Sequence, residues 1–206
     1  MNSELRRRTR SDATRNRDLI LSAAMVTLNE SPRASMEEIA VVAGVSRATL
    51  YAHFPTRQAL VVTTLKKVLS QANAQIAGLD PELSPEEAVD ALVVTSWRLL
   101  GQFQGMTVAA EREVSARELR RMHDESAEQI RRLLIQGRRD GSFRVDQDLH
   151  WQVECVYALV RAGFSHAGNT NQAYVDPSVD VATSIRAVLS AVREESDSES
   201  SQPRHR

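Results

Sequence analysis

The sequence predicts an all-helical protein with about nine helices. Glycine and proline are scarce, at 8 and 6 of 206 residues, and the alternation of β-branched residues that is typical of strands is almost absent. Several windows instead repeat apolar residues at i, i+3 or i+4, and i+7, which is the spacing of one face of a helix. With 42% hydrophobic residues, the chain can bury a sizeable core.

The N-terminal segment is polar and rich in arginine, and a helix is predicted to follow it. Residues 1–13 (MNSELRRRTRSDA) lack an apolar periodicity, so we expect a flexible basic arm there. Within residues 14–30, Ile20, Ala24 and Leu28 recur at i, i+4 and i+8 and form the apolar stripe of a first helix. A Ser-Pro pair then ends this helix.

A pair of short helices is predicted next. Ser35 and Glu38 have the S-x-x-E spacing of a capping box, in which each side chain satisfies a free backbone N–H of the other's turn. The helix that starts there should end at Gly44, because glycine adopts a positive φ without steric cost. Ser46 is placed to cap a third helix, which Pro55 prevents from continuing.

Apolar residues define the inner faces of these two short helices. In the second helix we expect Ile39, Val42 and Ala43 to point inward. In the third helix, Leu50 and Phe54 lie one turn apart and should pack back against them.

The rest of the chain predicts longer helices and a polar tail. A fourth helix can run without a break over residues 56–77. Further helices are expected over residues 85–104, 107–121, 123–139, 149–166 and 179–192. Residues 194–206 have the composition of a disordered tail.

Two short helices joined by a glycine-containing turn are the outline of a helix-turn-helix, whose second helix enters the major groove of DNA. Arg47, Ala48 and Tyr51 lie on the side of the third helix that is opposite its apolar residues. Near the start of that helix, Arg47, Ala48 and Thr49 combine hydrogen-bonding groups with little bulk, as a groove-facing helix requires.

The segment SMEEIAVVAGVSRATLYAHFPTRQAL, residues 35–60, resembles the helix-turn-helix signature of the tetracycline-repressor (TetR) family of bacterial transcription factors. The apolar helix before it and the long helix after it match the family in order and length. The resemblance implies a helix-turn-helix DNA-binding domain over residues 14–60, followed by a helical effector-binding and dimerisation domain over residues 61–193.

The same resemblance implies a function. It implies a sequence-specific transcriptional regulator, a repressor by analogy, that binds an inverted repeat in double-stranded DNA as a homodimer. A small-molecule effector would then release it from the DNA.

Carried over position by position, the resemblance implies base contacts from Arg47 and Ala48, with Thr49 contacting a base or a phosphate. Phosphate contacts are implied for Tyr51, His53, Arg57 and Ser35. The family often has glycine at the position of Ala48 and lysine at that of Arg57. Each residue also has a plainer interpretation, because serines simply cap helices and aromatic side chains cover hydrophobic clusters. The set expected at the DNA is Ser35, Ser46, Arg47, Ala48, Thr49, Tyr51, His53 and Arg57.

Charge is unevenly distributed along the chain. The total is 26 Lys+Arg against 27 Asp+Glu, a net charge of −1. Residues 1–57 contain nine arginines and six acids, or +3, which leaves 17 basic and 21 acidic residues, or −4, in the remainder. One interpretation is that the arginines of the arm contact the minor groove or the phosphates of DNA. The other is that they only keep a solvent-exposed segment soluble. They are Arg6, Arg7, Arg8 and Arg10.

The part of the chain after the helix-turn-helix segment contains candidates for an effector pocket. These are Trp97, Phe103, Met106, Glu111, Trp151 and Tyr157. Large apolar residues pack in a core more often than they bind a ligand, and single charged groups on helices are usually solvated or paired. Both interpretations stay open at the level of the sequence.

The expected homodimer interface lies on the last two helices, where apolar residues recur at helical spacing. With their symmetry mates these helices would form a four-helix bundle, as the resemblance implies. The interface residues expected are Val153, Val156, Val160, Phe164, Ile185 and Leu189.

Other function classes find little support in the sequence. It has no H-E-x-x-H spacing and no glycine-rich phosphate loop, so we expect no metal, no cofactor and no enzymatic activity. The single Cys155 cannot form an internal disulfide, and no apolar run approaches the ~18 residues of a membrane span. We therefore expect a cytoplasmic, nucleoid-associated protein. The alternative is a ligand-independent architectural or protein-binding helical module.

Overall fold

The computed structural model describes residues 2–169 and 177–190, with side chains described for residues 12–99, 101–163 and 178–190. These residues form α-helices and no extended strand, which confirms the all-helical prediction. The expected tail over residues 194–206 lies outside the described residues. The described residues contain ten helices: α1 (Asn2–Glu30), α2 (Met36–Ala43), α3 (Arg47–His53), α4 (Arg57–Ala77), α5 (Pro85–Gln102), α6 (Gln104–Glu113), α7 (Ala116–Met122), α8 (Asp124–Arg139), α9 (Leu149–Asn169) and α10 (Pro177–Leu189).

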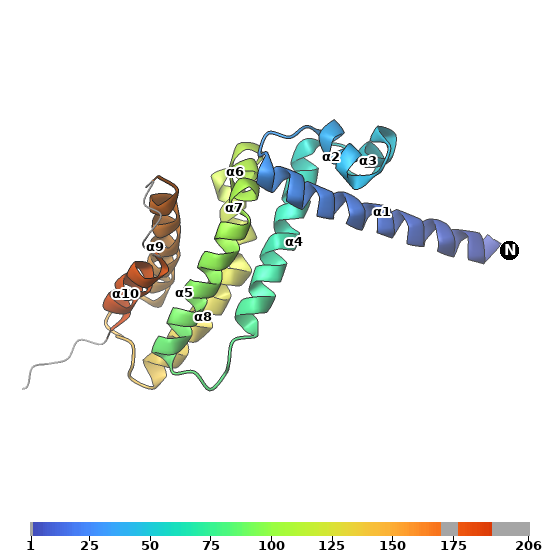
Figure 1. Cartoon of the computed structure of the whole chain (residues 1–206). Coiled ribbons are helices and arrows are strands. Elements are labelled where there is room, and N and C mark those ends of the chain that lie inside the picture. The colour runs from blue at the N-terminus through green and yellow to red at the C-terminus, as the bar shows by residue number, and fades with distance from the viewer. Residues whose placement is uncertain (1, 170–176, 191–206) are drawn as a thin grey trace, which may run out of the picture.

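The helix-turn-helix stands at one end of the molecule. The short helices α2 and α3 lie beside α1 and the start of α4, and the N-terminal part of α1 projects away from the other helices (Figure 1). From this end α4 runs down alongside α5 and α8, while α9 and α10 lie on the far side of α5 and α8. The long α4 therefore connects the helix-turn-helix directly with the larger helical part.

The first hydrophobic core joins α1 to α4 with one side of α6. The predicted α1 stripe of Ile20, Ala24 and Leu28 is fully buried in it. Leu50 and Phe54 are 0% and 2% exposed, which confirms the predicted inner side of α3. A helix from the second half of the chain thus completes the core of the first half, through Met106, Ala109 and Ala110.

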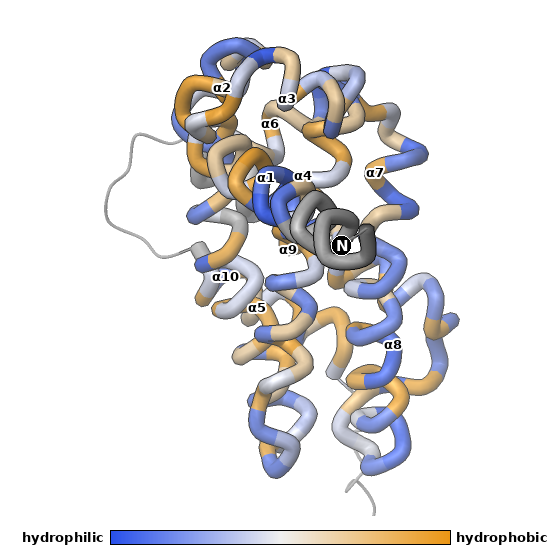
Figure 2. The backbone as a smooth tube through the Cα atoms, turned by 90° about the vertical axis from the view of Figure 1, so that its right-hand side faces the viewer, coloured by the Kyte–Doolittle hydropathy of each residue, from blue (hydrophilic) through white to orange (hydrophobic). Residues whose placement is uncertain are grey.

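The second hydrophobic core lies among α5, α8, α9 and α10. Along α5 and α8, hydrophobic and hydrophilic segments alternate, as expected for helices that bury one side (Figure 2). Leu134 of α8 is fully buried there, together with residues of α9 and α10.

The stripes expected at a dimer interface belong to this second core. Val153 and Val156 are 3% exposed, Ile185 and Leu189 are 0% exposed, and Val160 packs partly buried against the same cluster. They point into their own chain because α5 and α8 cover the apolar sides of α9 and α10, which the sequence alone did not reveal. The side chain of Phe164 lies outside the described residues.

The start of the first helix differs from the prediction. This helix begins at Asn2 rather than Thr14, because residues 2–13 contain no glycine or proline and are rich in arginine, a good helix former. The segment expected as an arm is thus continuous with α1.

The predicted helix over residues 107–121 is wrong. The structure has α6 and α7 in its place, because Ser115 ends one helix and caps the next: its hydroxyl accepts a hydrogen bond from the Glu118 amide at 3.2 Å. The inward position predicted for Val42 is also wrong, since this side chain is 57% exposed. The short α2 buries Ile39 and Ala40 instead.

The predicted caps of α2 and α3 are present. The Ser35 amide donates to Glu38 Oε2 at 2.6 Å, and the Glu38 amide donates to Ser35 Oγ at 3.2 Å, so both halves of the capping box form. Gly44 has a φ of 67°, and the Ser46 hydroxyl accepts from the Thr49 amide at 3.1 Å. Local sequence therefore determines the geometry of the turn between the two helices.

The last turn of α1 crosses the start of α6 at van der Waals contact. A Cβ atom added to Gly105 would lie 2.0 Å from the Asn29 carbonyl oxygen, so only glycine fits there. The Asn29 side chain accepts from the Gly105 amide at 3.0 Å and donates to the Gln102 carbonyl at 2.8 Å. One side chain therefore satisfies a free N–H at the start of α6 and a free carbonyl at the end of α5.

Arg57 forms a second connection between the two halves. Its Nε donates to Glu113 at the end of α6 at 2.8 Å, and its Nη2 donates to the Pro32 carbonyl at 2.9 Å. Its Nη1 donates to the Ala34 carbonyl. Both ends of α6 are thus bonded to the half of the chain that contains the helix-turn-helix, one through Asn29 and the other through Arg57.

None of the helices in residues 2–169 and 177–190 combines the length and the apolarity needed to cross a membrane.

The α1–α6 contact gives a test of the fold. Gly105→Ala should lower the free energy of unfolding by about 1–3 kcal/mol, because the added methyl group forces the two backbones apart. The measurement is denaturant unfolding followed by circular dichroism.

Gly101→Ala is the matched control for this substitution, because a Cβ there meets no atom within 4 Å. Gly101 lies in the last turn of α5 without a positive φ, so alanine should instead raise the free energy of unfolding by up to about 0.5–1 kcal/mol. Equal effects of the two substitutions would contradict the close approach of α1 and α6.

Candidate nucleic-acid interface

The outer side of α3 is the candidate DNA-binding surface. Leu50 and Phe54 anchor its inner side, while Arg47 and Ala48 at its start are exposed. Tyr51, one turn after Arg47, is partly buried. The structure therefore places basic, small and aromatic side chains together on a convex helix surface, as base recognition in the major groove requires.

Hydroxyl groups at the start of α3 are bonded to one another. Ser46 Oγ and Thr49 Oγ1 lie 2.8 Å apart, in addition to the capping bond from the Thr49 amide. Because each hydroxyl can both donate and accept, this pair keeps capacity for a further bond to a base or a phosphate. His53 is the last residue of α3 and is partly buried.

Ser35 is held at the start of α2. Its hydroxyl donates to Glu38 Oε2 at 2.8 Å and accepts from the Glu38 amide. Hydrogen bonds from the Ser35 backbone and side chain hold the pKa of the Glu38 carboxyl below its usual value, so this carboxylate stays ionised. A phosphate contact from Ser35 would have to form while Ser35 keeps its hydrogen bonds with Glu38.

Arg47 has contacts that the sequence did not predict. Its Nη2 lies 2.9 Å from Glu37 Oε1 on α2, and its guanidinium carbon lies 5.4 Å from the centre of the Tyr51 ring. The guanidinium is thereby held between an acid and an aromatic ring while most of its surface stays exposed. The pattern of apolar residues gives no reason to single out Glu37. An acidic residue in the helix before the recognition helix is the sequence feature that could have indicated this contact.

Arg57 is placed differently from the other expected DNA contacts. Its side chain is 24% exposed, and its guanidinium is bonded to Glu113 and to the carbonyl groups of Pro32 and Ala34. The phosphate contact expected of Arg57 stays a prediction. Its bonds in the structure join helices, as described above.

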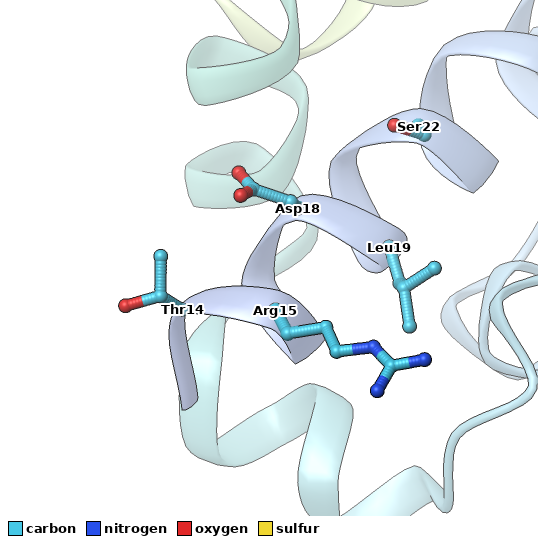
Figure 3. Close-up of a pocket in the computed structure, with 5 residues that line it drawn as sticks. All are labelled: Thr14, Arg15, Asp18, Leu19 and Ser22. Carbon is cyan, nitrogen blue, oxygen red and sulfur yellow. The ribbon is translucent and has the colours of Figure 1, made fainter. Parts of the chain in front are cut away.

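A large open hollow of about 610 Å³ lies along α1. Figure 3 shows that its five lining residues all come from this one helix, with the side chains of Arg15 and Leu19 extending to the same side. The hollow therefore has no opposing wall among these residues, and it does not resemble the enclosed site of a small ligand. The lining residues are Thr14, Arg15, Asp18, Leu19 and Ser22.

The six residues expected in an effector pocket do not line one common cavity. Met106 is fully buried and Phe103 is packed in the first core, whereas Trp97 packs against the second. Trp151 is 60% exposed and Glu111 is exposed as well. Met106 and Phe103 thus pack where α6 meets the half of the chain that contains the helix-turn-helix.

Tyr157, another member of that set, lines a groove on the surface. A groove of about 220 Å³ between α7, α8 and α9 is bordered by Tyr157, His123 and Asp124, and an ion pair of 2.8 Å joins Arg120 to Glu154 at its edge. The rings of His123 and Tyr157 meet edge to face, with centres 5.5 Å apart. Polar, charged and aromatic groups therefore converge in this groove.

Burial changes the titration of both rings in the groove. It lowers the pKa of His123 below its usual value near 6.5, with a smaller opposing effect from the hydrogen bond to the Leu119 carbonyl and a further lowering by Arg161. Burial also raises the pKa of Tyr157. At neutral pH the groove therefore presents an uncharged imidazole and an uncharged phenol.

Comparison with known proteins identifies the family. Residues 20–64 match the profile described as bacterial regulatory proteins, tetR family. The HTH-type transcriptional repressor LfrR of Mycolicibacterium smegmatis is 31% identical over 153 residues, which are 74% of this chain and 79% of LfrR. The chain belongs to the TetR family of bacterial regulatory proteins. It is therefore a helix-turn-helix transcriptional regulator rather than an enzyme.

Solved structures of TetR-family regulators have the same fold. The LfrR structure, solved in complex with proflavine, has a TM-score of 0.61 and 26% identity, covering 85% of this chain and 96% of that one. The fatty acid degradation regulator FadR from Bacillus halodurans has a TM-score of 0.72 at 18% identity, covering 86% and 96% of the two chains. Because only 18% of the residues are identical, the similarity to FadR supports the fold and not a shared function.

The outer side of α3 predicts two different binding phenotypes. Arg47→Ala should cost about 1–3 kcal/mol on the preferred site and relax base preference, because the base contact expected of Arg47 would be lost. Tyr51→Phe should weaken binding by about 1 kcal/mol on every sequence, because the contact expected of Tyr51 is to a phosphate, which carries no sequence information. Fluorescence anisotropy on preferred and scrambled duplexes at one salt concentration measures both. Unchanged preference in Arg47→Ala would contradict this placement of α3.

The buried imidazole predicts a pH dependence of stability. Because the pKa of His123 is lower in the folded than in the unfolded chain, the unfolded chain binds more protons between the two values. Stability should therefore be lost as pH falls below about 6.5, and His123→Gln should flatten that loss in urea titrations between neutral and mildly acidic pH. His150→Gln, at an exposed histidine of the same groove, is the control and should leave the wild-type pH profile in place.

Proposed function

We propose that this TetR-family regulator is a repressor that binds an inverted repeat in double-stranded DNA as a homodimer and leaves it when a small-molecule effector binds. The observation that carries the proposal is the exposed side of α3, where Arg47 and Ala48 stand opposite the anchoring residues Leu50 and Phe54. Membership of a family that includes the repressor LfrR supports repression. The site of action would be the nucleoid in the cytoplasm.

A homodimer is the physical expectation for a protein with one short recognition helix. Such a helix reads only a few base pairs, which is too few for a tight and unique site. Two copies related by a two-fold axis would read two half-sites in opposite directions, and the operator would be an inverted repeat.

The proposed dimer surface is the outward side of α9. Trp151 is 60% exposed, and Ala158 and Ala162 follow it at i+7 and i+11 with exposed side chains. Small residues along a helix allow a second helix to approach closely, and an exposed tryptophan adds apolar area to bury. This surface replaces the inward stripes that the sequence suggested.

The proposed effector site is the groove between α7, α8 and α9. Its two uncharged aromatic rings and the carboxylate of Asp124 suit a planar aromatic compound that carries a positive charge. Proflavine, which is bound in the LfrR structure, belongs to that class and is the first compound to test.

The proposed route from effector to DNA passes through α6. Its ends are bonded to α1 and α4 by Asn29 and Arg57, so a shift of α6 would move both helices that carry the helix-turn-helix. An effector that favours one position of α6 would thereby change the fraction of protein in which the two copies of α3 fit successive major grooves.

One experiment tests the proposal as a whole. The full chain is used to select duplexes from a random pool, and the binding of the selected duplex is compared with that of a scrambled duplex at matched salt, with and without proflavine. A repressor of this kind should select an inverted repeat and prefer it by about 10³-fold or more. Equal affinity for both duplexes would instead favour an architectural or protein-binding module, the second function considered from the sequence.

The proposed dimer surface yields a separate prediction. Ala158→Arg should raise the dimer dissociation constant at least about tenfold, because like charges would face each other across the two-fold axis. Analytical ultracentrifugation over a concentration series measures this constant. Ala74→Arg, at an exposed alanine of α4, adds the same charge elsewhere and should leave it unchanged. A dimer equally stable in both variants would place the interface on another surface.

A further inference from the structure

Glu37 lies next to the recognition helix and has no role in the function described so far. It is in the first turn of α2, and its Oε1 lies 2.9 Å from Nη2 of Arg47. The Arg47 guanidinium also lies over the Tyr51 ring. An acid from one helix and an aromatic ring from the next therefore hold the arginine that is expected to contact bases.

This ion pair is not needed for the fold. The side chains of Arg47 and Glu37 are 68% and 47% exposed, and ion pairs so exposed to water contribute little to stability. The start of α2 is already capped by the reciprocal bonds of Ser35 and Glu38. Glu37, the second acid in this turn, therefore affects mainly the binding of charged molecules such as DNA to this surface.

The position of Glu37 makes it unfavourable for DNA in general. Its carboxylate lies beside the side of α3 that would face the duplex, where phosphate groups repel it. While Arg47 remains in this ion pair, the pair is neutral and attracts DNA less than a free arginine would. Non-specific binding, which depends on phosphate attraction, should therefore be weakened.

The same contact favours a sequence-specific bond. The guanidinium has five N–H donors, so an ion pair that involves one side of Nη2 leaves other donors free for a guanine edge. Restraint by Glu37 and Tyr51 reduces the conformational entropy that Arg47 loses when it binds a base. The cognate base can thus accept a hydrogen bond from an Arg47 side chain that is already oriented. DNA of other sequences binds less well, because the Arg47–Glu37 pair is nearly neutral.

We infer that Glu37 is a specificity-determining positioning residue: it orients Arg47 for its base contact and lowers the affinity for non-cognate DNA. This inference rests on the proposed DNA-binding function, and it names a residue that acts through Arg47 rather than on the DNA itself.

The test compares Glu37→Gln with Glu86→Gln in the full chain. Glu86 is in the first turn of α5 and is exposed, at the end of α5 that lies far from α2 and α3 (Figure 1), so the two substitutions change net charge equally at equivalent helix positions. Binding to the duplex selected by the wild-type protein and to a scrambled duplex is measured by fluorescence anisotropy over a salt series. Thermal unfolding checks that each variant is folded.

Glu37→Gln should raise affinity for the scrambled duplex about three- to tenfold, with a smaller or no gain on the selected duplex, so that the ratio of the two affinities falls. Glu86→Gln should leave both affinities unchanged. Glu37→Asp retains the charge but shortens the side chain, so it should keep the weak binding to scrambled DNA and lose affinity for the selected duplex. This third variant separates orientation from charge.

Two outcomes overturn the inference and are distinguishable from a failure of the proposed function. If the wild-type protein prefers its selected duplex and Glu37→Gln has the same preference, Glu37 does not determine specificity. If Glu86→Gln changes the ratio as much as Glu37→Gln does, only total charge matters. A wild-type protein that prefers no duplex at all would instead contradict the proposed function, before any variant is considered.

Discussion

The contact between the end of α1 and the start of α6 is the constraint on which the rest of the structure depends. At this crossing Gly105 lets the two backbones touch, and Asn29 bonds to the chain on both sides of the α5–α6 junction. Phe103, the capping residue of α6, makes no side-chain capping bond of its own, so the start of this helix relies on α1. The two hydrophobic cores are joined here by hydrogen bonds of defined direction, which resist sliding better than apolar contact alone.

The same joint explains why α3 can present a fixed surface. α6 adds Met106, Ala109 and Ala110 to the core that holds α1 to α4, and Arg57 bonds the far end of α6 to the loop before α2. The short α3 makes few contacts of its own, and its orientation follows from the helices around it. Both helices that carry the helix-turn-helix, α1 and α4, are therefore bonded to α6.

Residues of the candidate site differed in how well the sequence predicted them. The inner side of α3 was predictable because Leu50 and Phe54 follow a helical period, and the caps at Ser35 and Ser46 were predictable because they depend on residues three apart. Glu37 and Arg57 were not, since their partners, Arg47 and Glu113, depend on how separate helices are packed. The residues expected in the effector pocket were chosen mostly because they are aromatic or apolar, and the structure places them in different parts of the chain. Periodicity shows which side of a helix is apolar, but not which neighbouring helix that side contacts.

The sequence by itself determined the helical class, the start and end of α2, α3 and α4, and the family, because caps, breaks and apolar stripes act over a few residues. Tertiary structure decided the direction in which the stripes of α9 and α10 point, and it placed them in the second core of their own chain. It also decided that α6 would complete the first core, and that Arg57 would be bonded to α6 and to the loop before α2. These outcomes depend on which helices compete for the same apolar surface, and that competition is settled only when the whole chain packs.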